Sequence, residues 1–152
     1  MRERKGEGES EAMKTVMMDA FYAMGHEART TNAREMSGQG VIGKMWSTGV
    51  PGASAIVAVY SEYASDKDGE YSYLLGVKVG ESEKAPRDLV RRKVEEGKYM
   101  QLSARENKAG AVIGLWQQVW ALESEGKIQR AYKTDFEMYS ETGVDLYVGV
   151  KS

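Results

Sequence analysis

The sequence predicts an α+β protein in which two strand–helix–strand–strand units form one antiparallel sheet of about eight strands with two main helices. Two observations predict this fold. Short apolar patterns recur in both halves: VIGKMW at Val41–Trp46 returns as VIGLW at Val112–Trp116, and LLGVK at Leu74–Lys78 returns as YVGVK at Tyr147–Lys151. Aromatic, strand-like runs surround both helical patterns in the same order. Since one helix covers only part of a sheet face, we expect the two units to share a core.

The length and the composition predict one folded domain. The chain has 152 residues, about one domain by the usual length prior. Residues 2–11 are charged and glycine-containing without an apolar side chain, so residues 1–12 are expected to form a mobile tail. Residues 13–152 are then expected to form a single domain of two pseudo-repeats, residues 13–80 and 97–151.

The composition also excludes several classes of function. The chain contains no cysteine, which excludes disulfides, thiol catalysis and zinc–thiolate sites and fits a cytoplasmic protein. The net charge of the chain is −2, whereas proteins that bind nucleic acids usually carry an excess of basic residues. No apolar run approaches the roughly 20 residues of a membrane helix. We therefore expect a cytoplasmic protein that contacts neither nucleic acid nor membrane directly.

The first half begins with a strand-like run and continues into a helix. The apolar run Met13–Met24 is expected to form the strand, and Gly25 is expected to end it. Asn32 and Glu35 have the spacing of a capping box, which predicts a helix start. An apolar stripe that includes Trp46 follows at helical spacing.

A hairpin is expected after this helix. Gly49 and Pro51 are expected to end the helix. The runs Ala55–Tyr63 and Glu70–Val79 are rich in β-branched and aromatic residues and are separated by the turn-forming letters SDKDG. A polar connection at residues 80–87 follows, and residues 88–96 fit either a short helix or an extended link.

The second half repeats this order with a clearer helix. A strand is expected at Lys98–Ala104 and an amphipathic helix at Ala111–Ser124, which Gly126 ends. A second hairpin is expected from Arg130–Tyr139 and Val144–Lys151.

Two acidic residues in the first strand of that hairpin point to a site. Asp135 and Glu137 are two residues apart, so on a strand they share one face. An unpaired buried charge is costly, so this face is either wet or lines a pocket that takes a cation. For Glu137 the alternative to a pocket is a strand-edge acid paired with Lys133 or Arg130. Asp135 could be a second pocket acid, but it is expected to accept hydrogen bonds from the backbone or from a basic side chain.

Four motifs carry a resemblance to a known family: RTTN before the first helix, LW-x-x-x-W in the second helix, R-x-Y-x-x-DFE-x-Y, and V-x-L-Y-V-G-V. Over about Met13–Lys151 the chain resembles the gyrase-inhibitor-like small-molecule-binding family. These are the effector-binding domains of AraC-type and MerR-type multidrug-sensing regulators, which also occur alone in integron cassette proteins. The resemblance implies a central pocket for amphipathic, often cationic, drug-like molecules and gives Glu137 the contact with the ligand cation. Such regulators carry a helix-turn-helix domain, for which this chain has no room.

The candidate ligand-binding residues combine this acid with aromatic side chains that symmetry or strand alternation brings near it. They are Glu137, Trp46, Trp116, Trp120, Tyr139, Tyr147 and Tyr63. Ser61 is expected to be the repeat counterpart of Glu137, and Tyr63 that of Tyr139. Plain helix–sheet packing remains an alternative for the tryptophans. No catalytic residue, metal or cofactor is expected.

Three functions are compatible with the sequence. The first is stand-alone binding of cationic, amphipathic small molecules as a sensor or sink, including in transcriptional regulation through an unidentified protein partner. The second is hydrolysis of small molecules by the pocket glutamate as base or nucleophile. The third is inhibition of a topoisomerase through a protein-binding surface.

Overall fold

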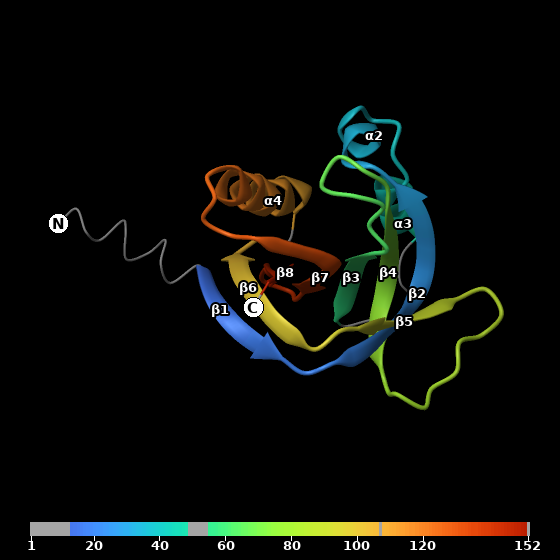
Figure 1. Ribbon diagram of the computed structural model, residues 1–152. Coiled ribbons are helices and arrows are strands. Elements are labelled where there is room, and N and C mark those ends of the chain that lie inside the picture. Colours follow the sequence, from blue (N-terminus) through green and yellow to red (C-terminus); the bar gives the residue numbers. More distant parts are fainter. Residues whose placement is uncertain (1–12, 49–54, 107, 152) are drawn as a thin grey trace.

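The computed structural model describes residues 13–48, 55–106 and 108–151. These residues form one eight-stranded antiparallel sheet with helices on one of its faces (Figure 1). The predicted α+β class is therefore confirmed. The predicted tail, residues 1–12, lies outside the described residues.

The described elements follow one another as strands with helices between them. In chain order they are β1 (Met13–Met18), β2 (Phe21–Thr30), α2 (Asn32–Met36), α3 (Ile42–Thr48), β3 (Ile56–Ser61), β4 (Tyr71–Val79), β5 (Val90–Val94), β6 (Gly97–Ala104), α4 (Ala109–Ser124), β7 (Arg130–Tyr139) and β8 (Val144–Val150). The strand order in the sheet is β1-β6-β8-β7-β3-β4-β2-β5. None of the described helices is long and apolar enough to cross a membrane.

The sheet order places equivalent strands of the two halves symmetrically about the β7–β3 pair. Two strands are exchanged: β1, the first strand of the first half, pairs with β6 of the second half, and β5, which lies in the link between the halves, pairs with β2 of the first. Residues 88–96, for which the sequence left two options, contain β5 and so are partly extended. Each edge strand of the sheet thus pairs with a strand that lies far from it in the sequence.

Two short links force this sheet to curl. β1 and β2 lie six strand positions apart, about 29 Å in a flat sheet, yet only Asp19 and Ala20 connect them. Three Cα–Cα steps span at most about 11 Å. A two-residue link of the same kind joins β5 to β6. The two edges must therefore approach each other, and Figure 1 shows the strands bent in this way.

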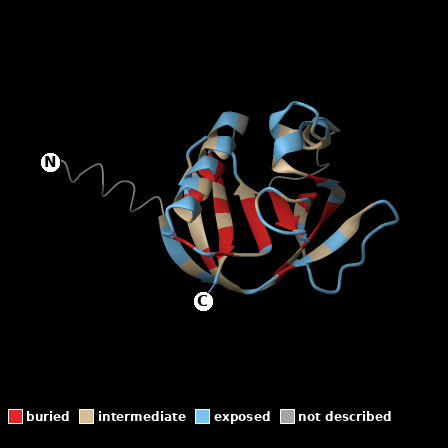
Figure 2. Cartoon of the chain, turned by 45° about the horizontal axis from the view of Figure 1, so that its top comes forward, coloured by how far each residue is buried: buried red, intermediate tan, exposed pale blue. Residues whose placement is uncertain are grey.

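The curled sheet has an apolar cluster on each face, because side chains alternate along every strand. The first cluster lies under the helices and includes Ala58, Tyr60 and Leu146. The second cluster lies on the other face of the sheet and includes Phe21, Val59 and Phe136. Phe21 directly follows the short link between β1 and β2. In Figure 2 buried residues run through the central strands, whereas the outer surfaces of the helices are exposed.

Gly25 does not end the first strand, as the sequence analysis expected. The expected strand is divided after Met18, and β2 then runs through Gly25 to Thr30. Gly25 pairs with Gly76 of β4, and a Cβ atom at Gly25 would lie 2.0 Å from the carbonyl oxygen of Leu75. This glycine therefore permits a close approach of two strands rather than a turn.

The first helix is divided into α2 and α3 rather than continuous. Its N-cap is Thr31, whose hydroxyl accepts from the backbone N–H of Arg34, so the expected Asn32–Glu35 capping box is wrong. Gly38, with φ of +85°, follows α2 in a left-handed conformation that glycine adopts readily. The residues expected to end the helix, Gly49 and Pro51, lie outside the described residues.

Candidate functional site

A cavity of about 500 Å³ lies over the central strands, with α4 contributing one wall and α2 and α3 the other. The residues that line it come from both halves of the chain and from β3, β4 and β7 beneath the helices. They are Asn32, Glu35, Met36, Ile42, Gly43, Trp46, Tyr60, Tyr63, Lys67, Tyr71, Tyr73, Val112, Ile113, Trp116, Trp120, Arg130, Glu137 and Tyr139. This size and this aromatic lining are typical of a pocket for a small organic molecule.

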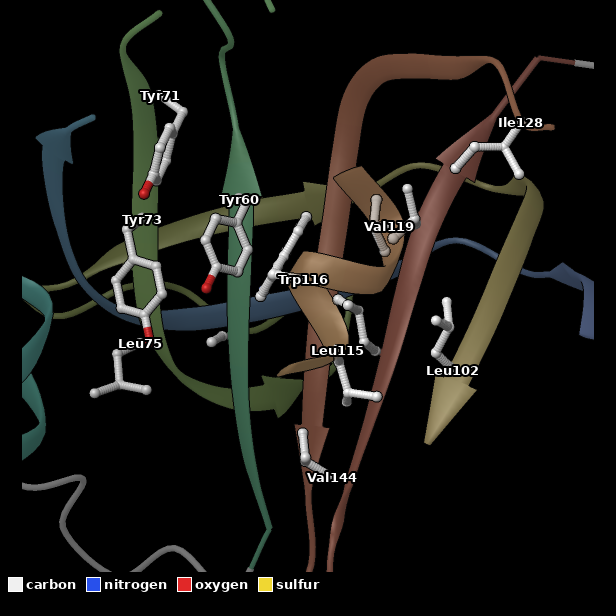
Figure 3. Close-up of a cluster of buried hydrophobic side chains, with 13 residues drawn as sticks. Tyr60, Tyr71, Tyr73, Leu75, Leu102, Leu115, Trp116, Val119, Ile128 and Val144 are labelled. Carbon is white, nitrogen blue, oxygen red and sulfur yellow. The ribbon is translucent and has the colours of Figure 1, made fainter. Parts of the chain in front are cut away.

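Aromatic rings form most of the inner wall of this cavity. Tyr60 on β3 lies beside Tyr73 on β4, with ring centroids 5.1 Å apart, and beside Trp116 on α4, 4.9 Å away. Figure 3 shows these three rings in a row. Trp46 on α3 contacts Tyr139 edge to face at 4.8 Å, and its Nε1 donates to the Tyr73 hydroxyl at 2.9 Å. These contacts hold the rings in fixed orientations around the cavity.

The carboxylate of Glu137 lies at the bottom of the cavity and is 1% exposed. Its Oε2 accepts hydrogen bonds from the Tyr60 hydroxyl and from Nε1 of Trp116, both at 2.7 Å. Its Oε1 accepts from the Tyr139 hydroxyl at 2.6 Å. All three donors are neutral side chains of the aromatic wall.

Glu137 forms no ion pair with any basic side chain among the residues that the structure describes. Burial raises the pKa of Glu137, and the hydrogen bonds from Tyr139, Trp116 and Tyr60 oppose this rise. When Glu137 is ionised, only neutral donors contact its carboxylate among the described residues, so a cation could bind beside it.

The neighbouring acid, Asp135, is compensated within the protein. Its carboxylate is fully buried and accepts from Nη2 of Arg130 at 2.8 Å and from the Tyr63 hydroxyl at 2.5 Å. Its Oδ1 also accepts from the backbone N–H of Gly149 at 2.7 Å. The expectation that Asp135 accepts hydrogen bonds from backbone and basic groups is confirmed.

Arg130 shows how this cavity wall accommodates a cation. Its guanidinium lies 4.3 Å from the ring centre of Tyr132, 5.4 Å from that of Trp116 and 5.6 Å from that of Tyr63. Burial alone would lower the pKa of Arg130, but Asp135, together with Tyr63 and Tyr132, outweighs burial and the pKa is raised. A carboxylate surrounded by aromatic rings therefore stabilises a buried positive charge here.

Six of the seven predicted site residues line the cavity: Glu137, Trp46, Trp116, Trp120, Tyr139 and Tyr63. Tyr147 does not lie there. It stacks on Phe136 at 4.6 Å on the opposite face of the sheet, so its expected place beside Glu137 is corrected. Tyr147 pairs with Phe136 in the strand register, and strand alternation directs both side chains away from the helices.

Ser61 is not the counterpart of Glu137. In the β3–β7 register Glu137 lies opposite Ala58, so the residues of β3 on its face are Ala58 and Tyr60. Ser61 lies opposite Thr134 and is one residue out of phase with that face. The first half contributes a tyrosine hydroxyl to the acid, not a serine.

Several cavity residues were not expected from the sequence. Tyr71 and Tyr73 are two residues apart on β4, so both side chains point to the face of the sheet that carries the helices. The sequence YSY could have predicted this shared orientation. Glu35 lines the cavity and accepts from the backbone N–H groups of Val41 and Ile42 at 2.9 and 3.2 Å. It therefore joins the end of α2 to the start of α3, a role that the sequence spacing does not reveal.

The described residues form one antiparallel sheet with an aromatic, acid-containing cavity that is lined from both halves of the chain. The chain belongs to the Cass2 family of integron-associated effector binding proteins, whose family model matches residues 14–150. The resemblance to effector-binding proteins of integron cassettes is thereby confirmed. No curated protein sequence matches the chain.

Solved structures show the same fold. The Vibrio cholerae integron cassette protein VCH_CASS2 is 30% identical, covers 92% of this chain and 96% of its own, and superposes with a TM-score of 0.78. SAV2435, solved with bound tetraphenylphosphonium, is 16% identical with a TM-score of 0.70 and coverages of 92% and 94%. A bacterial transcription regulation protein from Staphylococcus aureus is 15% identical with a TM-score of 0.67 and coverages of 92% and 98%.

Proposed function

We propose that this protein binds amphipathic, drug-like organic cations in its aromatic cavity and acts as a sensor or sink for them. One observation carries the proposal: the carboxylate of Glu137 is buried, receives three hydrogen bonds from neutral donors, and has no cationic partner among the described residues. An anion in a low-dielectric cavity attracts a cation far more strongly than one in water.

The aromatic lining supports the same class of ligand. Tyrosine and tryptophan faces attract a cation by about 0.5–2 kcal/mol each when they are desolvated. A quaternary or delocalised cation is weakly hydrated and therefore enters such a cavity at a lower cost than a small inorganic ion. The bound tetraphenylphosphonium of SAV2435, a protein of this fold, is a cation of this kind.

As a sensor the protein would report the bound cation to a separate protein partner, for instance in transcriptional regulation, whereas as a sink it would only lower the free concentration. The absence of cysteine from the sequence fits action in the cytoplasm. Direct contact with nucleic acid is not part of the proposal, since the chain carries a net charge of −2.

Intrinsic fluorescence tests the proposal, because all three tryptophans of the chain line the cavity. Titration with tetraphenylphosphonium should change the tryptophan emission saturably, with a stoichiometry of about one. An uncharged compound of similar shape should bind more weakly. Equal binding of the charged and uncharged compounds would contradict the proposal.

A further inference from the structure

The residues that line the cavity are almost fully buried at its bottom and partly exposed at its rim. Glu137 and Tyr73 at the bottom are each 1% exposed, and Tyr60 and Trp116 are each 8% exposed. Met36 on α2 is 60% exposed and Ile113 on α4 is 41% exposed, although both also line the cavity. The charge thus lies at the bottom and two large apolar side chains lie at the rim.

These two rim residues account for most of the exposed large apolar side chains that the structure describes. Three such side chains are markedly exposed, and the third, Met17, lies on the edge strand β1 and does not line the cavity. Met36 and Ile113 come from the two opposite helical walls. Their exposure is costly in the free protein and would be relieved by an apolar group lying between them.

Apolar side chains line part of both helical walls, beside the polar lining residues Asn32, Glu35, Lys67 and Arg130. Ile42 on α3 and Val112 on α4 line the cavity along with the tryptophans. A molecule whose positive charge lies against Glu137 must direct the rest of its structure towards the rim, because the sheet closes the cavity below. Ile42, Val112 and the tryptophans can then contact the apolar part of such a molecule.

We propose that the rim formed by Met36 and Ile113 is an apolar subsite that holds the tail of a ligand whose charged group lies at Glu137. This inference rests on the proposed function and adds to it the rim subsite and the direction in which the tail of the ligand lies. The tail buries the two exposed rim side chains, and the flexible thioether of Met36 adapts to tails of different shape.

A series of alkyltrimethylammonium ions with tails of four to ten carbons tests this orientation. Dissociation constants are measured by tryptophan fluorescence below the micelle concentration of each ion. In the wild type each methylene that becomes fully buried should increase the affinity by up to about fourfold, from the usual transfer free energy of a methylene group. The gain should level off when the tail extends beyond the rim.

Met36→Gln/Ile113→Gln removes the apolar rim while keeping residues that helices tolerate. In this double variant the affinity of the shortest ion serves as the reference, and the gain in affinity from the longer tails, measured relative to that ion, should be lost. Met17→Gln is the matched control, because it removes an exposed methionine away from the cavity, and it should leave the whole series unchanged.

Three results would overturn the inference: an affinity that does not depend on tail length, a gain that survives in the double variant, or a gain that Met17→Gln removes equally. Failure of the proposed function would look different. In that case Glu137→Gln would bind every ion of the series as tightly as the wild type, whatever the tail length contributes.

Discussion

The replacement Glu137→Gln tests the central charge of the cavity with little change of shape. In the variant the amide oxygen can occupy the position of Oε2, where it continues to accept from Tyr60 and Trp116. The amide nitrogen then lies beside the Tyr139 hydroxyl, which can rotate and accept instead of donating. The network is kept and the negative charge is removed.

The expected loss of affinity follows from the Coulomb attraction. Two unit charges 4 Å apart attract by about 4 kcal/mol at an effective dielectric constant of about 20. Dehydration of the cation and of Glu137 cancels part of this attraction. A net loss of about 1–3 kcal/mol remains, the range for interactions with charged groups, and corresponds to about 5- to 150-fold in the dissociation constant.

Calorimetry at low salt with benzyltrimethylammonium and with neopentylbenzene measures this loss. These two compounds have nearly the same shape, and one carries a charged nitrogen where the other has a carbon. Glu137→Gln should weaken binding of the cation by the amount above and leave binding of the neutral compound nearly unchanged. The stability of the free protein should hold or rise, because the variant no longer buries an uncompensated charge.

Asp145→Asn is the matched control for a general electrostatic effect. Asp145 lies on β8 opposite Met138, on the face of the sheet away from the helices, and accepts from the Ser103 hydroxyl. Its replacement removes the same charge and should change cation affinity by no more than about 0.5 kcal/mol. If wild type and Glu137→Gln bind benzyltrimethylammonium equally tightly, the reasoning about a cation-binding carboxylate is refuted.

Five further outcomes follow from the structure and the sequence. Since burial raises the pKa of Glu137, affinity for a permanent cation should increase with pH through that pKa, while Glu137→Gln should show a flat profile in the same titration. The folded protein binds a proton there more readily than the unfolded chain, so the stability contributed by Glu137 should fall as pH rises from about 4.3 through the raised pKa, as pH-dependent urea denaturation would detect. Arg130→Met leaves Asp135 buried without its cation and should cost about 3–5 kcal/mol in urea denaturation; a further Asp135→Asn should recover part of this, and no recovery would argue against the pair. Glu35→Ala removes the acceptor for two backbone N–H groups at the start of α3 and should cost about 0.5–2 kcal/mol in the same assay, a smaller change indicating that α3 does not need the contact. The protein should not shift any duplex DNA in a gel at physiological salt, and a salt-resistant shift would contradict the expectation drawn from its net charge.

The sequence predicts the regular parts of this fold because local patterns determine them. The amphipathic stretch of α4 and the alternating runs of β3, β4, β7 and β8 were expected within a few residues of their observed ends. The exchange of β1 and β5 was not foreseen, because long-range pairing leaves no local pattern. The role of Gly25 was predicted wrongly for a related reason. A side chain at this position would clash with the backbone of Leu75 and Gly76, which lie far from Gly25 in the sequence.

The site was predicted where strand alternation alone decides which way a side chain points. Glu137 and Tyr139 share a face of β7 and both line the cavity. Tyr147 was misplaced because its orientation depends on the register between β8 and β7, which the sequence does not specify. A shift of one residue in that register would have directed it to the other face.

The stretch Arg130–Tyr139 contains two acids, Asp135 and Glu137, that point to the same face of the sheet and are almost equally buried. They differ in whether a basic side chain pairs with them. Asp135 is paired with Arg130, whose guanidinium is enclosed by aromatic rings. Glu137 lies two residues along the same strand beside the same indole of Trp116, but only neutral groups donate to it. A protein that needed only a stable core would gain from replacing such a carboxylate with an apolar group. Under the proposed function, a cation from outside the chain would be held beside Glu137 as Arg130 is held beside Asp135.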